Sequence, residues 1–146
     1  MAYQGMYTPK NPSKYVGDPQ NIVYRSLWEK RFFDYCDTKS EVLEWASEEF
    51  FVPYLSPVDK QMHRYFPDVY LKVKTETGHK VLIVEIKPKY QTQQPQQRKR
   101  RTKKFLTEVA TYAVNQAKWA AARAYCAQRQ WQFLVLTEEH LFGTFK

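Results

Sequence analysis

The chain has 146 residues, enough for one domain or at most two, and its 43% hydrophobic and 16% aromatic content excludes disordered, collagen-like and coiled-coil classes. No apolar run is long enough for a membrane-spanning helix and the first residues lack the apolar stretch of a secretory signal, so no membrane partner is expected. The net charge of +8 indicates a polyanionic partner, whereas two cysteines are too few for a disulfide scaffold or a four-cysteine zinc site.

An irregular N-terminal arm is predicted over residues 1–23, because three prolines and two glycines interrupt this segment without a regular apolar pattern. A domain over residues 24–146 is expected to follow. It begins with a helix, since Ser26 and Glu29 have the spacing of a capping box and apolar residues then recur at helical intervals up to about Thr38.

The next segments favour strands. Residues 42–48 fit a short strand or a turn, and residues 50–55 fit an edge strand because they contain Pro53. Residues 56–63 are expected to form a loop.

A hairpin is predicted after this loop. Residues 65–74 alternate between apolar and polar side chains, as in a strand with one buried face. A turn is expected at residues 75–78. Residues 81–86 are apolar except for Glu85, as in a strand that is covered on both faces.

The last third of the chain favours a polar loop, a long helix and a final strand. The loop is expected at residues 91–97, the helix at 99–129, and the strand at 131–136, with a short helix from Thr137. The residues expected on the buried stripe of the long helix are Phe105, Val109, Tyr112, Ala113, Ala117, Ala120, Ala121 and Ala124. This order of elements predicts an α/β domain.

One short window accounts for the whole excess of positive charge. Its eight basic residues are Lys87, Lys89, Arg98, Lys99, Arg100, Arg101, Lys103 and Lys104. The other 15 of the 23 basic residues are balanced by the 15 acidic residues of the chain. Nucleic acid is the commonest partner of such a cluster, and the alternative is a solvated loop without a partner.

The predicted hairpin brings two carboxylates together. In an antiparallel hairpin the residue numbers of every directly opposed pair add up to the same total. A four-residue turn pairs Lys74 with His79. This register sets Asp68 opposite Glu85, with Cβ atoms about 4.5–5.5 Å apart. Lys87 then lies on the same face as Glu85. A slip of one residue would separate the carboxylates.

Two opposed carboxylates repel each other unless a cation lies between them, and this pair suits Mg²⁺, with Mn²⁺ as an expected substitute. Such an ion would polarise a phosphate and activate a water, and Lys87 would orient that water or stabilise charge on the phosphate. The alternative is that Asp68, Glu85 and Lys87 are ordinary strand residues. Glu85 argues against it, because a buried carboxylate requires a partner.

The segment Pro67-Asp68, sixteen intervening residues, and then Glu85-Ile86-Lys87 resembles the PD-(D/E)XK nuclease signature. The predicted elements resemble the αβββαβ core of that restriction-endonuclease-like superfamily, which implies a central mixed sheet flanked by helices. The resemblance implies catalytic roles for Asp68, Glu85 and Lys87. It implies metal ligation by Asp68, Glu85, the Ile86 backbone carbonyl and Glu29, although Glu29 as a simple helix cap stays open.

Longer segments resemble the head-completion nucleases of contractile-tailed phages. They are residues 11–15, 17–19, 24–30, 64–68, 84–89, 114–119 and 136–139. This resemblance implies endonuclease activity on packaged double-stranded DNA, with exonuclease activity left open, and a role in head completion and head–tail joining. It implies phage head or neck proteins as partners and a place in the host cytoplasm during assembly, with association with the virion left open. Monomer and dimer both remain open.

Two rival functions remain at this stage. One is a non-catalytic head–tail connector that binds DNA on a nuclease scaffold, and the other is a recombination or transposition nuclease on the same core. Arg25 and Lys89 complete the expected DNA contacts, because both flank the predicted site. Tyr65 and Phe66 are expected to pack rather than to act in the site.

Overall fold

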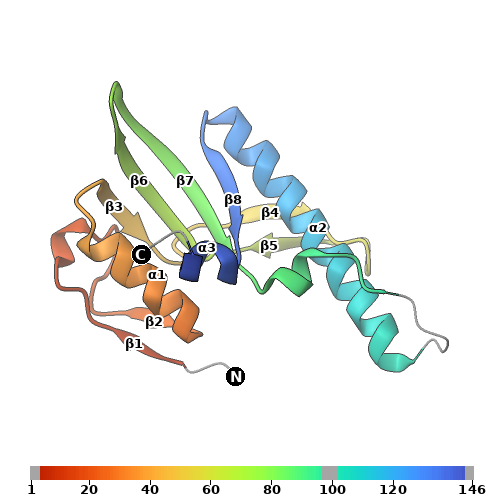
Figure 1. The fold of residues 1–146 in the computed structure, drawn as a ribbon. Coiled ribbons are helices and arrows are strands. Elements are labelled where there is room, and N and C mark those ends of the chain that lie inside the picture. The colour runs from red at the N-terminus through yellow and green to blue at the C-terminus, as the bar shows by residue number, and fades with distance from the viewer. Residues whose placement is uncertain (1–3, 97–101, 144–146) are drawn as a thin grey trace.

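A four-stranded mixed sheet organises the molecule, with helices on both of its faces (Figure 1). The computed structural model describes residues 4–96 and 102–143. The sheet has the order β3-β6-β7-β8, in which β8 is parallel to β7 and the other neighbours are antiparallel. Its strands are β3 (Val42–Ala46), β6 (Val69–Thr75), β7 (Gly78–Ile86) and β8 (Gln132–Leu136). The predicted α/β class is confirmed.

Helix α1 (Leu27–Thr38) covers one face of the sheet. The Ser26 hydroxyl accepts a hydrogen bond from the Glu29 N–H at 3.2 Å, which caps the helix as the sequence predicts. Phe33 is fully buried on this side and packs against Trp45 of β3, with ring centroids 5.2 Å apart. The short helix α3 (Glu138–Gly143) adds the buried Leu141 to the same core.

The opposite face is covered by helix α2 (Lys103–Gln128) and by a separate hairpin of β4 (Val52–Leu55) and β5 (Met62–Tyr65). The structure therefore divides the predicted strand 65–74. β5 ends at Tyr65, and β6 begins at Val69 and pairs with a different strand. Pro67 lies between them and interrupts the extended segment, because it has no N–H to donate to a neighbouring strand.

The β6–β7 hairpin has the predicted register. Val69 pairs with Val84, and Lys74 pairs with His79. The ladder extends by one further pair, Thr75 with Gly78, so the turn itself is two residues shorter than predicted. Gly78 has a φ of 151°, a backbone conformation that favours glycine.

The N-terminal segment differs from the predicted irregular arm. Strands β1 (Gly5–Tyr7) and β2 (Ile22–Tyr24) pair with each other, and the 3₁₀ turn η1 (Pro12–Lys14) lies between them. Tyr7, Tyr15 and Ile22 belong to the core around α1. The large apolar side chains of these three residues anchor the segment to the core, although its prolines predicted an irregular backbone.

The predicted apolar stripe of α2 is only partly right, because Ala117 and Ala121 pack against the core whereas Val109, Ala120 and Ala124 are exposed. The buried residues of the helix are Asn115, Trp119, Ala122 and Cys126. Alanines on every side of the helix blur the pattern, and the N-terminal half of α2 extends beyond the sheet (Figure 1), where Val109 is exposed. Before α2, the 3₁₀ turn η2 (Lys89–Thr92) follows the end of β7. None of the described helices combines the length and the apolar character that crossing a membrane requires.

Candidate active site

Asp68 and Glu85 meet at the open end of the β6–β7 ladder. The last ladder pair is Val69 with Val84, and the two carboxylates occupy the next position beyond it. Asp68 Oδ2 accepts a hydrogen bond from the Ile86 N–H at 2.8 Å, while Glu85 is only 5% exposed. The structure thus brings together the two residues that the hairpin register predicts.

Tyr65 is a partner of Glu85 that the sequence analysis missed. Its hydroxyl, which is buried, donates a hydrogen bond to Glu85 Oε1. The residue lies at the end of β5, a strand whose pairing with β4 was not predicted. The expectation that Tyr65 only packs is therefore corrected.

Two lysines face the carboxylates from different elements. Lys87 Nζ lies 3.8 Å from Glu85 Oε2, as the shared face of β7 predicts. Lys118 Nζ, from α2, lies 5.7 Å from the ring centroid of Tyr65 and 5.9 Å from that of Tyr54. Lys118 is absent from the predicted site, because nothing in the sequence relates its position on α2 to the hairpin.

Burial raises the pKa of both carboxylates. Burial, followed by the charges of Glu85 and Glu29, raises the pKa of Asp68 well above its usual range. Burial also raises the pKa of Glu85, although the hydrogen bond from Tyr65 and the charges of Lys87 and Lys118 oppose this shift. The ionised form of the pair is therefore not fully compensated by the surrounding protein groups.

Glu29 extends this acidic region from the first turn of α1. Burial raises the pKa of Glu29 to about 7, and the charges of Glu48 and Glu85 add to the shift. The Arg25 N–H, which donates to Glu29 Oε1 at 3.3 Å, opposes it. Glu29 therefore belongs to the first, capped turn of α1 and also interacts electrostatically with Asp68 and Glu85.

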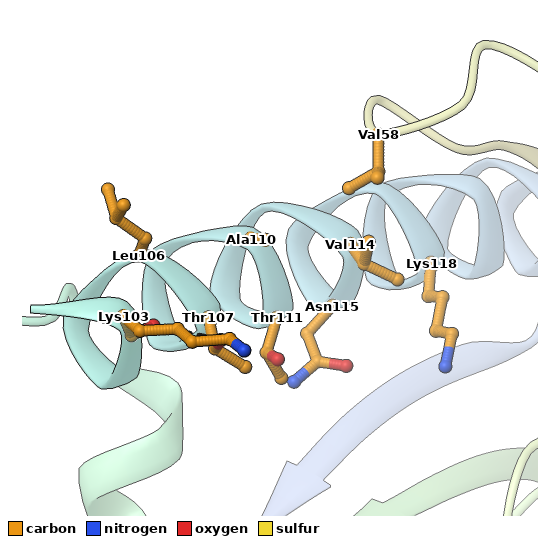
Figure 2. A pocket seen from close by; sticks show the side chains of 9 residues that line it. All are labelled: Val58, Lys103, Leu106, Thr107, Ala110, Thr111, Val114, Asn115 and Lys118. Atoms are coloured by element: carbon orange, nitrogen blue, oxygen red, sulfur yellow. Dashed lines mark hydrogen bonds between the residues drawn. The ribbon is translucent and has the colours of Figure 1, made fainter.

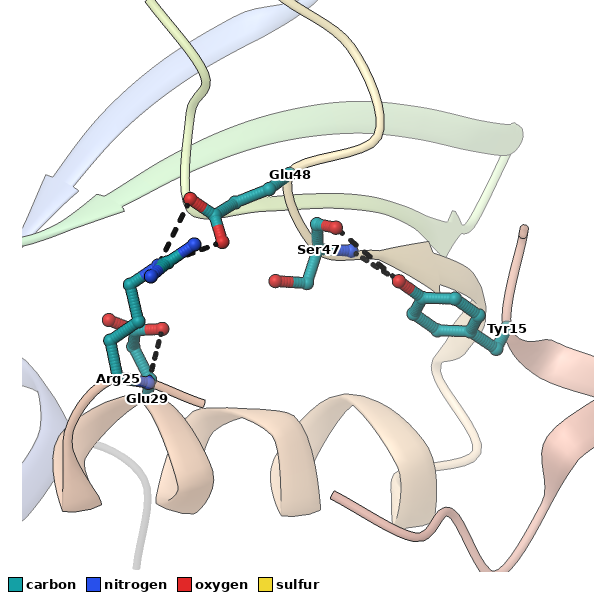
Figure 3. A network of polar contacts seen from close by, with 5 residues as sticks. All are labelled: Tyr15, Arg25, Glu29, Ser47 and Glu48. Carbon is teal, nitrogen blue, oxygen red and sulfur yellow. Dashed lines mark hydrogen bonds and ion pairs between the residues drawn. The ribbon is translucent and has the colours of Figure 1, made fainter. Parts of the chain in front are cut away.

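A polar network holds the loop after β3 next to Glu29 (Figure 3). The Ser47 N–H donates to the Tyr15 hydroxyl at 3.1 Å, so a residue of the N-terminal segment fixes this loop. Glu48 adopts a φ of 53° and accepts a hydrogen bond from Arg25 Nε at 3.1 Å. Arg25, predicted to contact DNA, is thus part of an ion pair in this structure.

Three of the other predicted DNA contacts lie among the described residues, on two different elements. Lys89 Nζ lies 2.7 Å from Glu139 of α3, and both side chains are exposed. Lys103 and Lys104 are exposed in the first turn of α2. Arg98, Lys99, Arg100 and Arg101 lie outside the described residues.

The donor chemistry fits a divalent metal ion. Glu29, Ile86 and Lys87 line a hollow of about 490 Å³ between the start of α1 and the end of β7. The N–H of Ile86 faces Asp68, and the carbonyl of a strand residue points to the same side as its N–H. Within the described ranges no three His, Cys, Asp or Glu side chains are gathered closely enough to form a ready metal cluster. The oxygen donors are therefore two carboxylates, one carbonyl and the more distant Glu29, a set typical of Mg²⁺ sites that retain waters.

The Tyr65 contact makes a prediction for stability. Replacement of Tyr65 by Phe deletes the hydroxyl and leaves the buried Glu85 carboxylate without this donor, so the free energy of unfolding should fall by about 1–3 kcal/mol. Urea unfolding at pH 8 measures it. Tyr90→Phe, a change at a side chain that is 71% exposed, serves as the control. Equal stability of Tyr65→Phe and the unmodified protein would contradict the prediction.

Comparison with known proteins agrees with this geometry. Residues 39–138 match the family described as "TnsA-like endonuclease N terminal", a range that includes Asp68, Glu85, Lys87 and Lys118. The chain is also 41% identical over 145 residues to the "Head completion nuclease" of Enterobacteria phage T4, which covers 97% of this chain and 95% of that protein. The chain therefore belongs to the TnsA-like endonuclease family, whose fold is restriction-endonuclease-like, and it is a relative of the T4 head completion nuclease.

Proposed function

We propose that this chain is a Mg²⁺-dependent deoxyribonuclease, with Mn²⁺ as a substitute, which hydrolyses phosphodiester bonds in double-stranded DNA. The observation that supports it most is the opposed pair Asp68 and Glu85, with Lys87 Nζ 3.8 Å from the Glu85 carboxylate, in a chain of an endonuclease family. A buried pair of carboxylates is unfavourable for folding, so its presence favours a role in chemistry.

Each residue has a distinct part in the proposed reaction. Asp68, Glu85 and the Ile86 carbonyl would hold the ion, and Glu29 would complete the ligands from α1. The bound ion supplies Lewis acidity toward the phosphate and lowers the pKa of a water. Lys87 is held beside Glu85, where its ammonium donates hydrogen bonds to the attacking water or to the phosphate oxygen on which charge develops.

The basic residues provide the proposed DNA contacts. They are Arg25, Lys89, Arg98, Lys99, Arg100, Arg101, Lys103 and Lys104. Lys103 and Lys104 are exposed and so are accessible to a phosphate backbone. Arg25 and Lys89 each have a glutamate partner, so their contacts with DNA require them to exchange Glu48 and Glu139 for phosphates.

The biological role that we propose is head completion. The T4 relative is named for it and matches nearly the whole chain, including the N-terminal segment that lies before the family match at residue 39. In this proposal the enzyme acts on packaged DNA or its end in the host cytoplasm, beside head or neck proteins, so that the filled head joins a tail. Both internal cutting and trimming from ends are part of the proposal.

Cleavage of circular and linear plasmid DNA tests this function. With Mg²⁺ or Mn²⁺ the protein should nick circles, and with EDTA it should leave them intact. Lys87→Met should lower the rate by about 10²–10³-fold, because an oriented donor to the developing charge is lost. Lys80→Met, a change at an exposed lysine of β7, the strand that Lys87 directly follows, is the matched control. Gradual shortening of linear DNA would show exonuclease action.

Two outcomes would overturn parts of this proposal. If the unmodified protein and Lys87→Met are equally inert while both bind DNA, the chain is the non-catalytic connector. The same two proteins, supplied to a phage that lacks this chain, test the biological role. Only the unmodified one should restore the joining of tails to filled heads, and normal virion assembly without either protein would favour a recombination nuclease.

A further inference from the structure

A groove runs along the N-terminal half of α2 and ends at Lys118 (Figure 2). It has a volume of about 440 Å³, and Val58, from the loop between β4 and β5, lies across it. Its polar lining residues come from successive turns of the helix. They are Lys103, Thr107, Thr111, Asn115 and Lys118, which we call the α2 row. Their spacing of three or four residues places them on one face of the helix.

Asn115 is the most buried residue of the row. The residue is 5% exposed, and its amide is not among the fully buried polar atoms that lack a hydrogen-bond partner in the described part of the chain. It lines the groove and also a second hollow of about 500 Å³ on the side of η2. An amide that lines two hollows can donate hydrogen bonds into them, so this position suits a ligand that accepts hydrogen bonds.

Lys118 connects the groove to the candidate active site. Its ammonium lies 5.7 Å from the centroid of the Tyr65 ring, and the hydroxyl of Tyr65 donates to Glu85. In Figure 2 its side chain extends from the helix on the same side as that of Asn115. A ligand that follows the α2 row toward Lys118 therefore arrives at the carboxylates.

The chemistry of the α2 row suits a polyanion with evenly spaced charges. Lysines stand at both ends, hydroxyl and amide groups stand between them, and no acidic side chain lines the groove among the described residues. The 15-residue separation of Lys103 and Lys118 corresponds to about 22 Å along the helix axis. One strand of DNA carries a phosphate about every 3.4 Å of duplex axis, so the row is long enough to meet several phosphates of one strand.

We propose that the α2 row binds the phosphate backbone of one DNA strand and that Lys118 contacts the phosphate nearest to Glu85. The proposal rests on the nuclease function above and assigns the path by which the strand reaches the carboxylates. It also explains why a lysine from α2 lies at a site that the hairpin residues otherwise form.

Binding without cleavage tests the α2 row. Fluorescence anisotropy of a fluorescein-labelled DNA duplex in EDTA, followed over a series of KCl concentrations, reports affinity and its salt dependence. Lys118→Gln should weaken binding by about tenfold and reduce the slope of log affinity against log salt by about 1, as expected for one lost phosphate contact. Lys118→Arg should retain the slope. Thr111→Glu should weaken binding further, whereas Ala124→Glu, at an exposed position of α2 outside the row, should not.

This binding experiment tests the α2 row independently of the proposed catalytic activity. Thermal unfolding checks that all four variants are folded. Normal affinity and an unchanged salt slope in Lys118→Gln and Thr111→Glu would overturn the α2 row even if the protein cuts DNA. The predicted losses would support the row even if the unmodified protein proves unable to cut.

Discussion

Asp68→Asn is expected to abolish DNA cleavage and, in the absence of metal, to raise the thermal stability of the protein. The carboxylate is proposed to hold the metal ion, and an amide is a far weaker ligand, so the cleavage rate should fall by at least about 10³-fold. The amide oxygen can still accept the hydrogen bond from the Ile86 N–H, so the end of the hairpin is preserved.

The expected gain in stability follows from the pKa of Asp68. Burial and the charges of Glu85 and Glu29 raise this pKa in the folded state. A carboxyl whose pKa is raised by folding stabilises the protein below its unfolded pKa and loses that contribution as the pH rises through the folded value. At pH 8, which is above the unfolded pKa, the Asp68 carboxyl therefore opposes folding, and the neutral amide removes this opposition.

Plasmid cleavage and thermal unfolding of the same preparations, at pH 8 in EDTA and in Mg²⁺, measure both effects. Glu76→Gln, a charge-removing change in the exposed turn between β6 and β7, controls for net charge. Addition of Mg²⁺ should stabilise the unmodified protein by binding to its folded state, and Asp68→Asn much less. Residual cleavage by Asp68→Asn at a rate near that of the unmodified protein would contradict the assignment.

The predictable part of this site lies within one hairpin. Its register follows from a two-residue period, a turn signal and a constant sum of residue numbers, all of which are local. For that reason Asp68, Glu85 and Lys87 were placed correctly relative to one another. The break at Pro67 changed the strand boundaries without changing this register, because it lies on the far side of Asp68 from the ladder.

The residues that sequence reasoning missed reach the site through long-range packing. Tyr65 arrives on β5, Lys118 on α2, and Glu48 on the loop after β3 that Tyr15 holds in place. No period in the sequence relates these segments to the hairpin, since their positions depend on how the layers pack. The same reason explains why part of the predicted stripe on α2 is misplaced, since alanines on all sides carry no directional signal.

The site as a whole has a charge arrangement that only the structure reveals. Acidic groups from α1, the β6–β7 hairpin and the loop after β3 interact electrostatically with one another, and Lys87, at the end of β7, and Lys118 of α2 act on the same carboxylates. Burial lowers the pKa of the Lys118 ammonium, whereas Glu85 and Asp68 oppose this shift. Negative groups at the centre with positive groups at the border suit a metal ion inside and a phosphate backbone outside.

The role of Glu29 can be decided by the effect of pH on stability. Folding raises its pKa from 4.5 to about 7, mainly through burial. The protonated carboxyl therefore stabilises the metal-free protein fully below pH 4.5, and this contribution, about 3 kcal/mol, is lost as the pH rises to 7 and above. Glu29→Gln stays neutral over this range and keeps an oxygen that can accept from the Arg25 N–H. The variant should thus become more stable than the unmodified protein as the pH increases.

Urea unfolding of both proteins from pH 4.5 to 8 in EDTA measures this difference, with Glu76→Gln as the control at an exposed glutamate. Curves for Glu29→Gln and the unmodified protein that stay parallel over the whole range would contradict the prediction. The same series in saturating Mg²⁺ then separates a ligand from a cap. If Glu29 binds the ion, Mg²⁺ should stabilise the unmodified protein more than Glu29→Gln at pH 8, because the ion favours the ionised carboxylate. If Glu29 only caps α1, the two proteins should gain equally from Mg²⁺.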